Sequence, residues 1–182
     1  MKTIPNIKEL NGARVLERGT KFLAKQIILH MQILALYKKV KPLRYSHAET
    51  LIWSDARNQL YTIGSRKDGA REIKVQDYYT KGHELRVLIP RVPLTRQQTI
   101  DLWQYQLTIK DNPYQKGNFA AWITYLKTGI WLGKEGDQKT YCYELGAKFS
   151  KVIGRWPKGK DTDKVSIYDI GYEDEWYVLT NG

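Results

Sequence analysis

The sequence predicts a single α+β domain built on an antiparallel sheet of about four to six strands packed with helices. Short segments of alternating apolar and polar residues, bounded by turn-forming residues, are typical of strands. Longer segments with apolar residues at helical spacing precede and follow them. The chain has 182 residues, enough for one substantial core. We therefore expect one domain over residues 1–182, with residues 1–12 as an N-terminal extension and residues 157–182 as a C-terminal tail.

The first expected elements are a strand and a long helix. Alternation from Ala13 to Gly19 predicts a short half-buried strand, after which Thr20 can cap a helix. The helix is expected over residues 21–39, ahead of Pro42. Its apolar residues recur at helical spacing: Phe22, Leu23, Ile27, Ile28, Met31, Leu34 and Leu36.

A hairpin and two further strands are expected next. Residues 45–53 and 59–63 are rich in β-branched and aromatic residues and flank a polar turn at residues 54–58. A second turn at residues 65–69 separates them from strands expected at residues 71–75 and 84–89, the latter closed by Pro90.

The second half of the chain is expected to be mainly helical. A helix from Thr95 to Lys110 has Ile100, Leu102, Trp103 and Leu107 on one side. A further helix is expected over residues 118–130, and another over residues 142–153. The aromatic and acidic tail, residues 165–179, is expected to close over the domain as strand or irregular structure.

Composition narrows the function classes. Hydrophobic residues make up 42% of the chain and charged residues 27%, which excludes wholesale disorder and coiled-coil architecture. The net charge of +11 favours polyanionic partners such as nucleic acid, acidic lipid or cell-wall polymer. A single cysteine excludes an internal disulfide and a multi-cysteine metal site, so we expect no metal or cofactor and a reducing, cytoplasmic location.

We expect no secretory signal and no transmembrane segment. The first six residues lack an apolar core followed by a cleavage site. The most apolar stretch, residues 27–37, is too short for a bilayer, which needs about 20 residues.

Cys142 is the candidate nucleophile because it lies at the start of a predicted helix. Unpaired N–H groups and the positive end of the helix dipole favour a thiolate there. The Cys142 N–H is also the natural first oxyanion donor. The alternative is a small buried apolar residue, which is the commoner state of a lone cysteine.

His47 is the candidate general base, near the start of a predicted strand. A histidine is more often structural, and His30 and His83 are weaker candidates. Glu144, in the first turn of the Cys142 helix, is expected to favour the helix dipole and is not placed in the catalytic set.

Four segments resemble the permuted papain-like cysteine hydrolases and amidases, whose bacterial and phage members are related to cell-wall peptidases. YSHAETLI, residues 45–52, resembles their histidine strand, and TYCYEL, residues 140–145, resembles their cysteine helix. RVLERG, residues 14–19, resembles their opening strand, and SRKDGAR, residues 65–71, resembles a turn of phage and bacterial members. The chain departs from the pattern at Tyr143, where serine is commoner, and at Gly69-Ala70 in place of two glycines.

The resemblance implies a papain-like fold in circularly permuted order, with His47 before Cys142. It also implies a His-x-Glu pattern in which Glu49 orients the His47 imidazolium. Same-face neighbours on a strand lie about 6.5 to 7 Å apart, which leaves the carboxylate little freedom to reach the ring. Thr62 or Ser65, on or after the neighbouring strand, are therefore alternatives for the third catalytic position.

The expected function is cysteine-dependent cleavage of an amide or ester bond, which would make the chain a thiol peptidase or amidase. The resemblance implies peptide, isopeptide, lipid or cell-wall amide substrates. Because the family has phage members, we also expect a virion-associated location if the protein is encoded by a phage. The rival hypotheses are a basic nucleic-acid-binding protein, with 13 Tyr and 6 Trp for base stacking, and a virion structural protein without turnover. No recognised nucleic-acid-binding motif supports the first rival.

Overall fold

The described part of the computed structural model contains a β-sheet and two long helices that pack on it. The described residues are 7–18, 25, 28–29, 32–33, 39, 45–66, 69–79, 85–113, 121, 124–125, 128, 130, 142–159, 161–162, 164–165, 169–170 and 177–179. The helices expected over residues 21–39 and 118–130 lie outside the described residues except at isolated positions, and so do His30 and His83.

Within these ranges, six strands form one antiparallel sheet in the order β4-β3-β2-β1-β5-β6. The predicted antiparallel sheet is confirmed. The expected hairpin is β2 and β3, and the C-terminal tail supplies β6. The strands are β1 (Arg14–Glu17), β2 (His47–Ser54), β3 (Gln59–Arg66), β4 (Gly69–Lys74), β5 (Leu85–Pro90) and β6 (Tyr177–Leu179).

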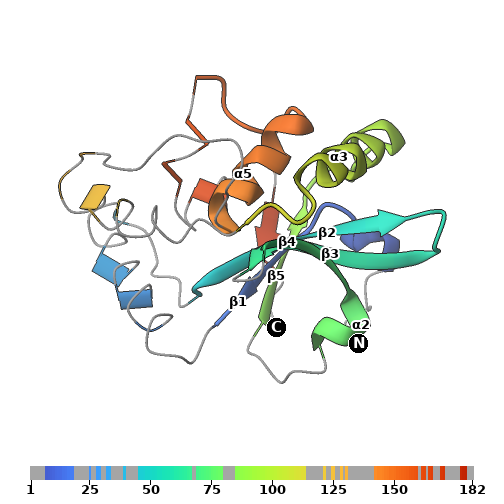
Figure 1. The fold of residues 1–182 in the computed structure, drawn as a ribbon, viewed down its shortest axis with the longest axis horizontal. Helices are drawn as coiled ribbons and strands as arrows, with labels where there is room; N and C mark the ends of the chain where they lie inside the picture. Colours follow the sequence, from blue (N-terminus) through green and yellow to red (C-terminus); the bar gives the residue numbers. More distant parts are fainter. Residues whose placement is uncertain are drawn as a thin grey trace.

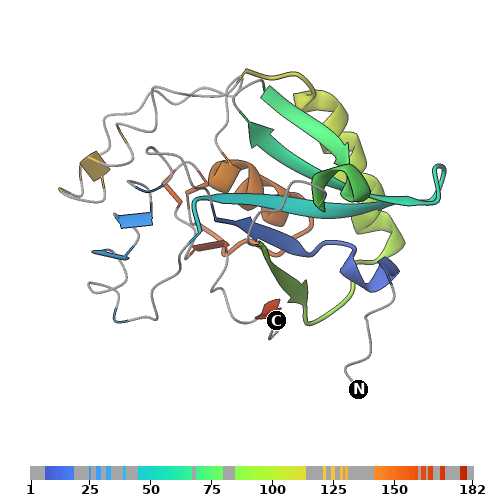
Figure 2. The same ribbon diagram turned by 90° about the horizontal axis from the view of Figure 1, so that it is seen from below.

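Helices α3 (Arg96–Ile109) and α5 (Cys142–Val152) lie on one face of this sheet, as Figures 1 and 2 show. The short helix α2 (Val75–Tyr79) lies on the other side of the sheet in Figure 1. The 3-10 helix η1 (Ile7–Leu10) precedes β1. A capping box formed by Thr95 and Gln98 begins α3, because each side chain bonds the other residue's backbone N–H.

Apolar residues that alternate along the strands form two clusters. One joins the sheet to the helices and contains Ile52, Ile63, Ala70, Leu102, Ile109, Leu145, Phe149 and Ile153. The other contains Ala13, Val15, Leu51, Trp53 and Leu60, with Leu10 of η1 packed against it. Since successive strand residues point to opposite faces, Leu51 and Ile52 belong to different clusters. The sheet therefore has an apolar core on both faces.

Strand β1 corrects one expectation, because it is buried on both faces and not half-buried. All four of its residues, Arg14 to Glu17, are buried. It pairs with β2 on one side and β5 on the other, which places it inside the sheet. Its two charged residues are accommodated by polar partners instead of solvent.

Helix α3 corrects another expectation. Ile100 and Leu107 were expected on the apolar side, yet they are 39% and 67% exposed. The buried stripe consists of Thr99, Leu102, Gln106 and Ile109. Leu102 is buried as expected and Trp103 packs against the core, but two members of the stripe are polar, so apolar periodicity alone did not identify the whole stripe. Thr99 is accepted there because its hydroxyl donates to the Thr95 carbonyl and accepts from Asn11.

Candidate active site

Cys142 is the first residue of α5, as the sequence predicted. Leu145 and Phe149, one and two turns further on, fix the helix against the sheet. Cys142 retains 6% of its surface exposed. Its thiol thus lies at the positive end of a packed helix, where the dipole favours a negative sulfur.

Glu144 follows in the first turn of α5 and is 2% exposed. Its carboxylate forms an ion pair of 2.7 Å with Lys148, one turn further along the same helix. A negative charge in this turn also complements the helix dipole. These contacts agree with the structural role expected for Glu144.

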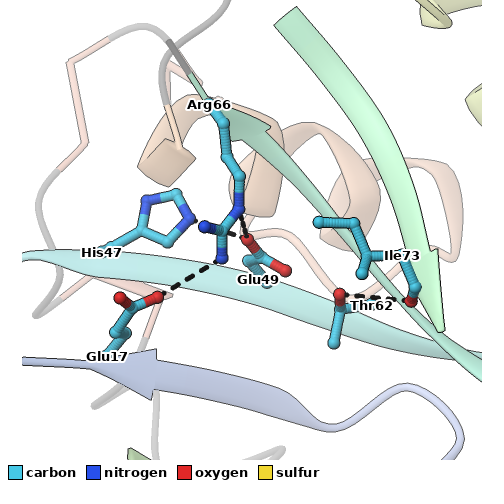
Figure 3. Close-up of polar contacts among 6 residues, drawn as sticks. All are labelled: Glu17, His47, Glu49, Thr62, Arg66 and Ile73. Atoms are coloured by element: carbon cyan, nitrogen blue, oxygen red, sulfur yellow. Dashed lines mark hydrogen bonds and ion pairs between the residues drawn. The ribbon is translucent and has the colours of Figure 1, made fainter. Parts of the chain in front are cut away.

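His47 is the first residue of β2, and its ring reaches Glu49 two residues further on (Figure 3). The distance from His47 Nε2 to Glu49 Oε1 is 2.9 Å. The expectation that Glu49 would have little freedom to reach the ring is therefore wrong, because the two side chains extend toward each other and close the gap between their Cα atoms. The structure brings His47 and Glu49 together.

Cys142 also lies close enough to raise the pKa of His47, so His47 interacts with both other candidate residues. Burial acts to lower the pKa of His47, but it is outweighed by the charge of the Cys142 thiolate, the hydrogen bond with that sulfur and the contacts with Glu49. Together they raise the pKa of His47 from 6.5 to about 10. His47 consequently stays protonated through neutral pH.

Glu49 is 3% exposed, and its charge is balanced by two cationic neighbours. Arg66 Nε donates to Glu49 Oε1 at 2.5 Å, and the same oxygen accepts from His47. Burial acts to raise the pKa of Glu49, but the hydrogen bond and charge of His47, then the charge of Arg66 and a hydrogen bond from Thr62, hold that pKa below its usual value. Glu49 is therefore a carboxylate in the site.

Thr62 and Ser65, the alternatives for the third position, both lie on β3 and are fully buried. Thr62 donates to the Ile73 carbonyl at 3.4 Å, and it also helps to lower the pKa of Glu49. It therefore acts on the carboxylate next to His47. The residue that the structure places on the His47 ring is Glu49.

Arg66 and Glu17 belong to the same cluster, and the sequence analysis predicted no role for either of them. Arg66 Nη2 lies 3.3 Å from Glu17 Oε2, and Glu17 pairs with His47 across β1 and β2. Arg66 does occur in the turn that supported the family resemblance. The available signal was an acidic residue, Glu17, at the end of one strand and an arginine, Arg66, at the end of another.

Arg14 is a second residue that the sequence did not single out. It is 1% exposed and donates to the Gly146 carbonyl at 2.6 Å and to Ser150 Oγ at 2.7 Å, both on α5. It also donates to Thr50 Oγ1 on β2. Arg14 therefore ties the helix that carries Cys142 to the strand that carries His47.

Metal ligation and membrane insertion were searched for in the described ranges. No group of three or more His, Cys, Asp or Glu side chains placed to hold a metal ion occurs among the described residues. The described part of the chain also contains no helix with the length and hydrophobicity needed to cross a membrane.

Comparisons with known proteins identify a similar fold. No family model matches the chain, and no curated protein matches it. Among solved structures, the crystal structure of metalloprotein yiiX from Escherichia coli O157:H7, a DUF1105 protein, superimposes with a TM-score of 0.52. The similarity covers 93% of this chain and 95% of that chain at 14% identity. At that identity, the chain is similar to that protein in its fold alone.

Proposed function

We propose that this chain is a cysteine-dependent hydrolase or acyltransferase that cleaves an amide or ester bond. The single observation that carries the proposal is that His47, bonded to Glu49 at 2.9 Å, also interacts electrostatically with Cys142 at the start of α5. A thiol at a helix N-terminus, a base beside it and a carboxylate behind the base are the parts that nucleophilic catalysis requires. The chain order, with His47 before Cys142, is that of the permuted papain-like enzymes that the sequence resembles.

In the proposed reaction, the Cys142 thiolate attacks the substrate carbonyl carbon and forms a tetrahedral oxyanion. The Cys142 N–H, at the start of α5, donates to that oxyanion. The His47 imidazolium then gives its proton to the leaving amine or alcohol, and the carbon–leaving-group bond breaks to give a thioester. His47, now neutral, takes a proton from water, which attacks the thioester and regenerates the thiolate. Throughout these steps, Glu49 holds the His47 ring in a fixed orientation.

The proposed substrates are peptides, isopeptides, lipids or cell-wall amides, as the resemblance implies. The net charge of +11 supports an anionic substrate surface, because a basic protein concentrates anionic polymers near it.

Trapping of the acyl-enzyme tests this proposal directly. The chain is incubated with a panel of activated esters and peptide amides, and its intact mass is measured. We expect a mass increase equal to one acyl group on Cys142 in the wild type and none in Cys142→Ala. Because the chain has one cysteine, the assignment needs no further mutation. Absence of acylation across the panel, together with ordinary reactivity of the thiol toward iodoacetamide, would contradict the proposal.

The pH profile provides a second test, through Glu49→Gln. The pKa of His47 is raised to about 10, so kcat/KM of the wild type should fall only as pH rises through about 10, where the leaving-group acid is lost. Because Glu49 contributes to raising that pKa, its neutral replacement should move the alkaline limb to lower pH by about one to three units. Glu72→Gln is the control, since Glu72 pairs with Arg57 away from the site. If the alkaline limb of the pH profile is the same in Glu49→Gln and the wild type, Glu49 does not raise the pKa of His47.

A further inference from the structure

We propose that Arg66 is a positioning residue that holds the Glu49 carboxylate against the His47 ring. We also propose that Gly64 leaves the space that the Glu49 side chain occupies. Both residues lie on β3, next to the strand that carries His47 and Glu49. The inference rests on the proposed function, because it assigns to β3 the task of orienting the catalytic pair.

The contacts of Arg66 define the position of the Glu49 carboxylate. Glu49 Oε1 accepts from Arg66 Nε at 2.5 Å and from His47 Nε2 at 2.9 Å. The guanidinium is planar, so the direction of its N–H groups is fixed once a second arm is held. That second arm reaches Glu17 Oε2 at 3.3 Å. In Figure 3, Arg66 extends from β3 across β2 toward Glu17 on β1. One side chain thus connects three adjacent strands above the site.

Gly64 explains why the carboxylate can lie where Arg66 holds it. A Cβ atom at position 64 would lie 2.5 Å from Glu49 Cγ, 2.7 Å from Cδ and 2.9 Å from Oε1. Carbon atoms do not approach to such distances, so any larger residue must displace the Glu49 side chain. A displaced carboxylate would lose its alignment with both His47 and Arg66. Glycine is therefore needed here for space.

Charge is the second reason that Glu49 needs Arg66. The Glu49 side chain is 1% exposed, and a buried carboxylate is costly unless cations compensate it. The ionisable groups around it are His47 on its own strand, Arg66 on β3, Glu17 beyond Arg66 on β1 and Cys142 beyond His47 on α5. Arg66 is the fixed cation of this group, because a guanidinium keeps its charge at all ordinary pH values, whereas His47 loses its proton as pH rises through about 10.

Alkylation of Cys142 by iodoacetamide, measured between pH 5 and 10, tests the inference without a known substrate. In the wild type we expect rapid labelling well below the ordinary thiol pKa of about 8.5. In Arg66→Met, Glu49 no longer holds the imidazolium, so labelling at pH 7 should slow by about tenfold or more and the profile should move to higher pH. Gly64→Ala should change the profile in the same direction.

Two further variants distinguish the effects of the charge and geometry of Arg66 on the labelling profile from its effect on folding stability. Arg66→Lys keeps the charge but not the two-armed geometry, so its profile should lie between those of the wild type and Arg66→Met. Arg57→Met removes another arginine ion pair, with Glu72, and should leave the profile unchanged. A purely structural role of Arg66 would lower the melting temperature without moving the profile.

The results distinguish failure of this inference from failure of the proposed function. If the wild type labels rapidly at neutral pH and both Arg66→Met and Gly64→Ala match it, β3 does not position Glu49 and the inference is overturned. If Arg66→Met does not fold, matching profiles for Arg66→Lys, Gly64→Ala and the wild type overturn it instead. If the wild type labels as an ordinary thiol and His47→Ala changes nothing, the proposed function itself is wrong.

Discussion

Replacing His47 with alanine should lower the rate of acyl transfer at pH 7 by about 10²–10⁴-fold, the usual contribution of general acid–base catalysis. In the proposed reaction, the variant loses the imidazolium that protonates the leaving group. The rate of ester or amide cleavage, measured on the best substrate of the acylation panel, checks the loss.

The matched control for this prediction is His83→Ala. His83 was one of the two weaker candidates in the sequence and has no part in the proposed reaction, so its removal should leave the rate within about twofold of the wild type. Equal losses in the two variants would show that His47 has no special role. A circular dichroism spectrum unchanged from that of the wild type is required for both.

The largest effect on stability is expected for Arg14→Ala. Arg14 is 1% exposed and donates to Gly146, Ser150 and Thr50, and its removal leaves these acceptors buried without it. Each unpaired buried group costs about 1–3 kcal/mol, and the cavity left by the side chain adds to that. We therefore expect the free energy of unfolding to fall by about 3 kcal/mol or more, as measured by urea denaturation.

Arg57→Ala is the control for the Arg14 variant. Arg57 forms an ion pair with Glu72 at the surface, where solvent screens the charges and replaces the partner. Its denaturation midpoint should therefore stay close to that of the wild type. A small effect of Arg14→Ala, similar to that of Arg57→Ala, would show that α5 is held to the sheet by apolar packing alone.

The sequence predicted the strands and α5 well because each has a local signal. Alternation and turn residues bounded β2 and β3, and apolar spacing after a polar break placed Cys142 at the start of α5. His47 and Cys142 were identified by their chemistry, since few side chains can act as a base or nucleophile near neutral pH. Glu49 was reached through the resemblance.

Other features of the structure could not be predicted because they depend on contacts between distant segments. Arg14 appeared as a polar position of a half-buried strand, and only the packing of α5 over β1 shows that it is buried. The role of Arg66 depends on the strand order that brings Glu17 and Glu49 within its reach. The buried stripe of α3 includes Thr99 and Gln106, which an apolar pattern does not detect.

The contact between Arg14 and Gly146 joins residues 132 positions apart, and it has a consequence for biosynthesis. Closing so long a loop is slow relative to forming a hairpin, so β2 and β3 should pair before the cysteine helix docks. During translation, β2 with His47 also leaves the ribosome well before Cys142 has been synthesised. The proposed catalytic pair of Cys142 and His47 would therefore form only after α5 has been synthesised and has packed on the sheet. The nascent chain would have no activity before that packing is complete.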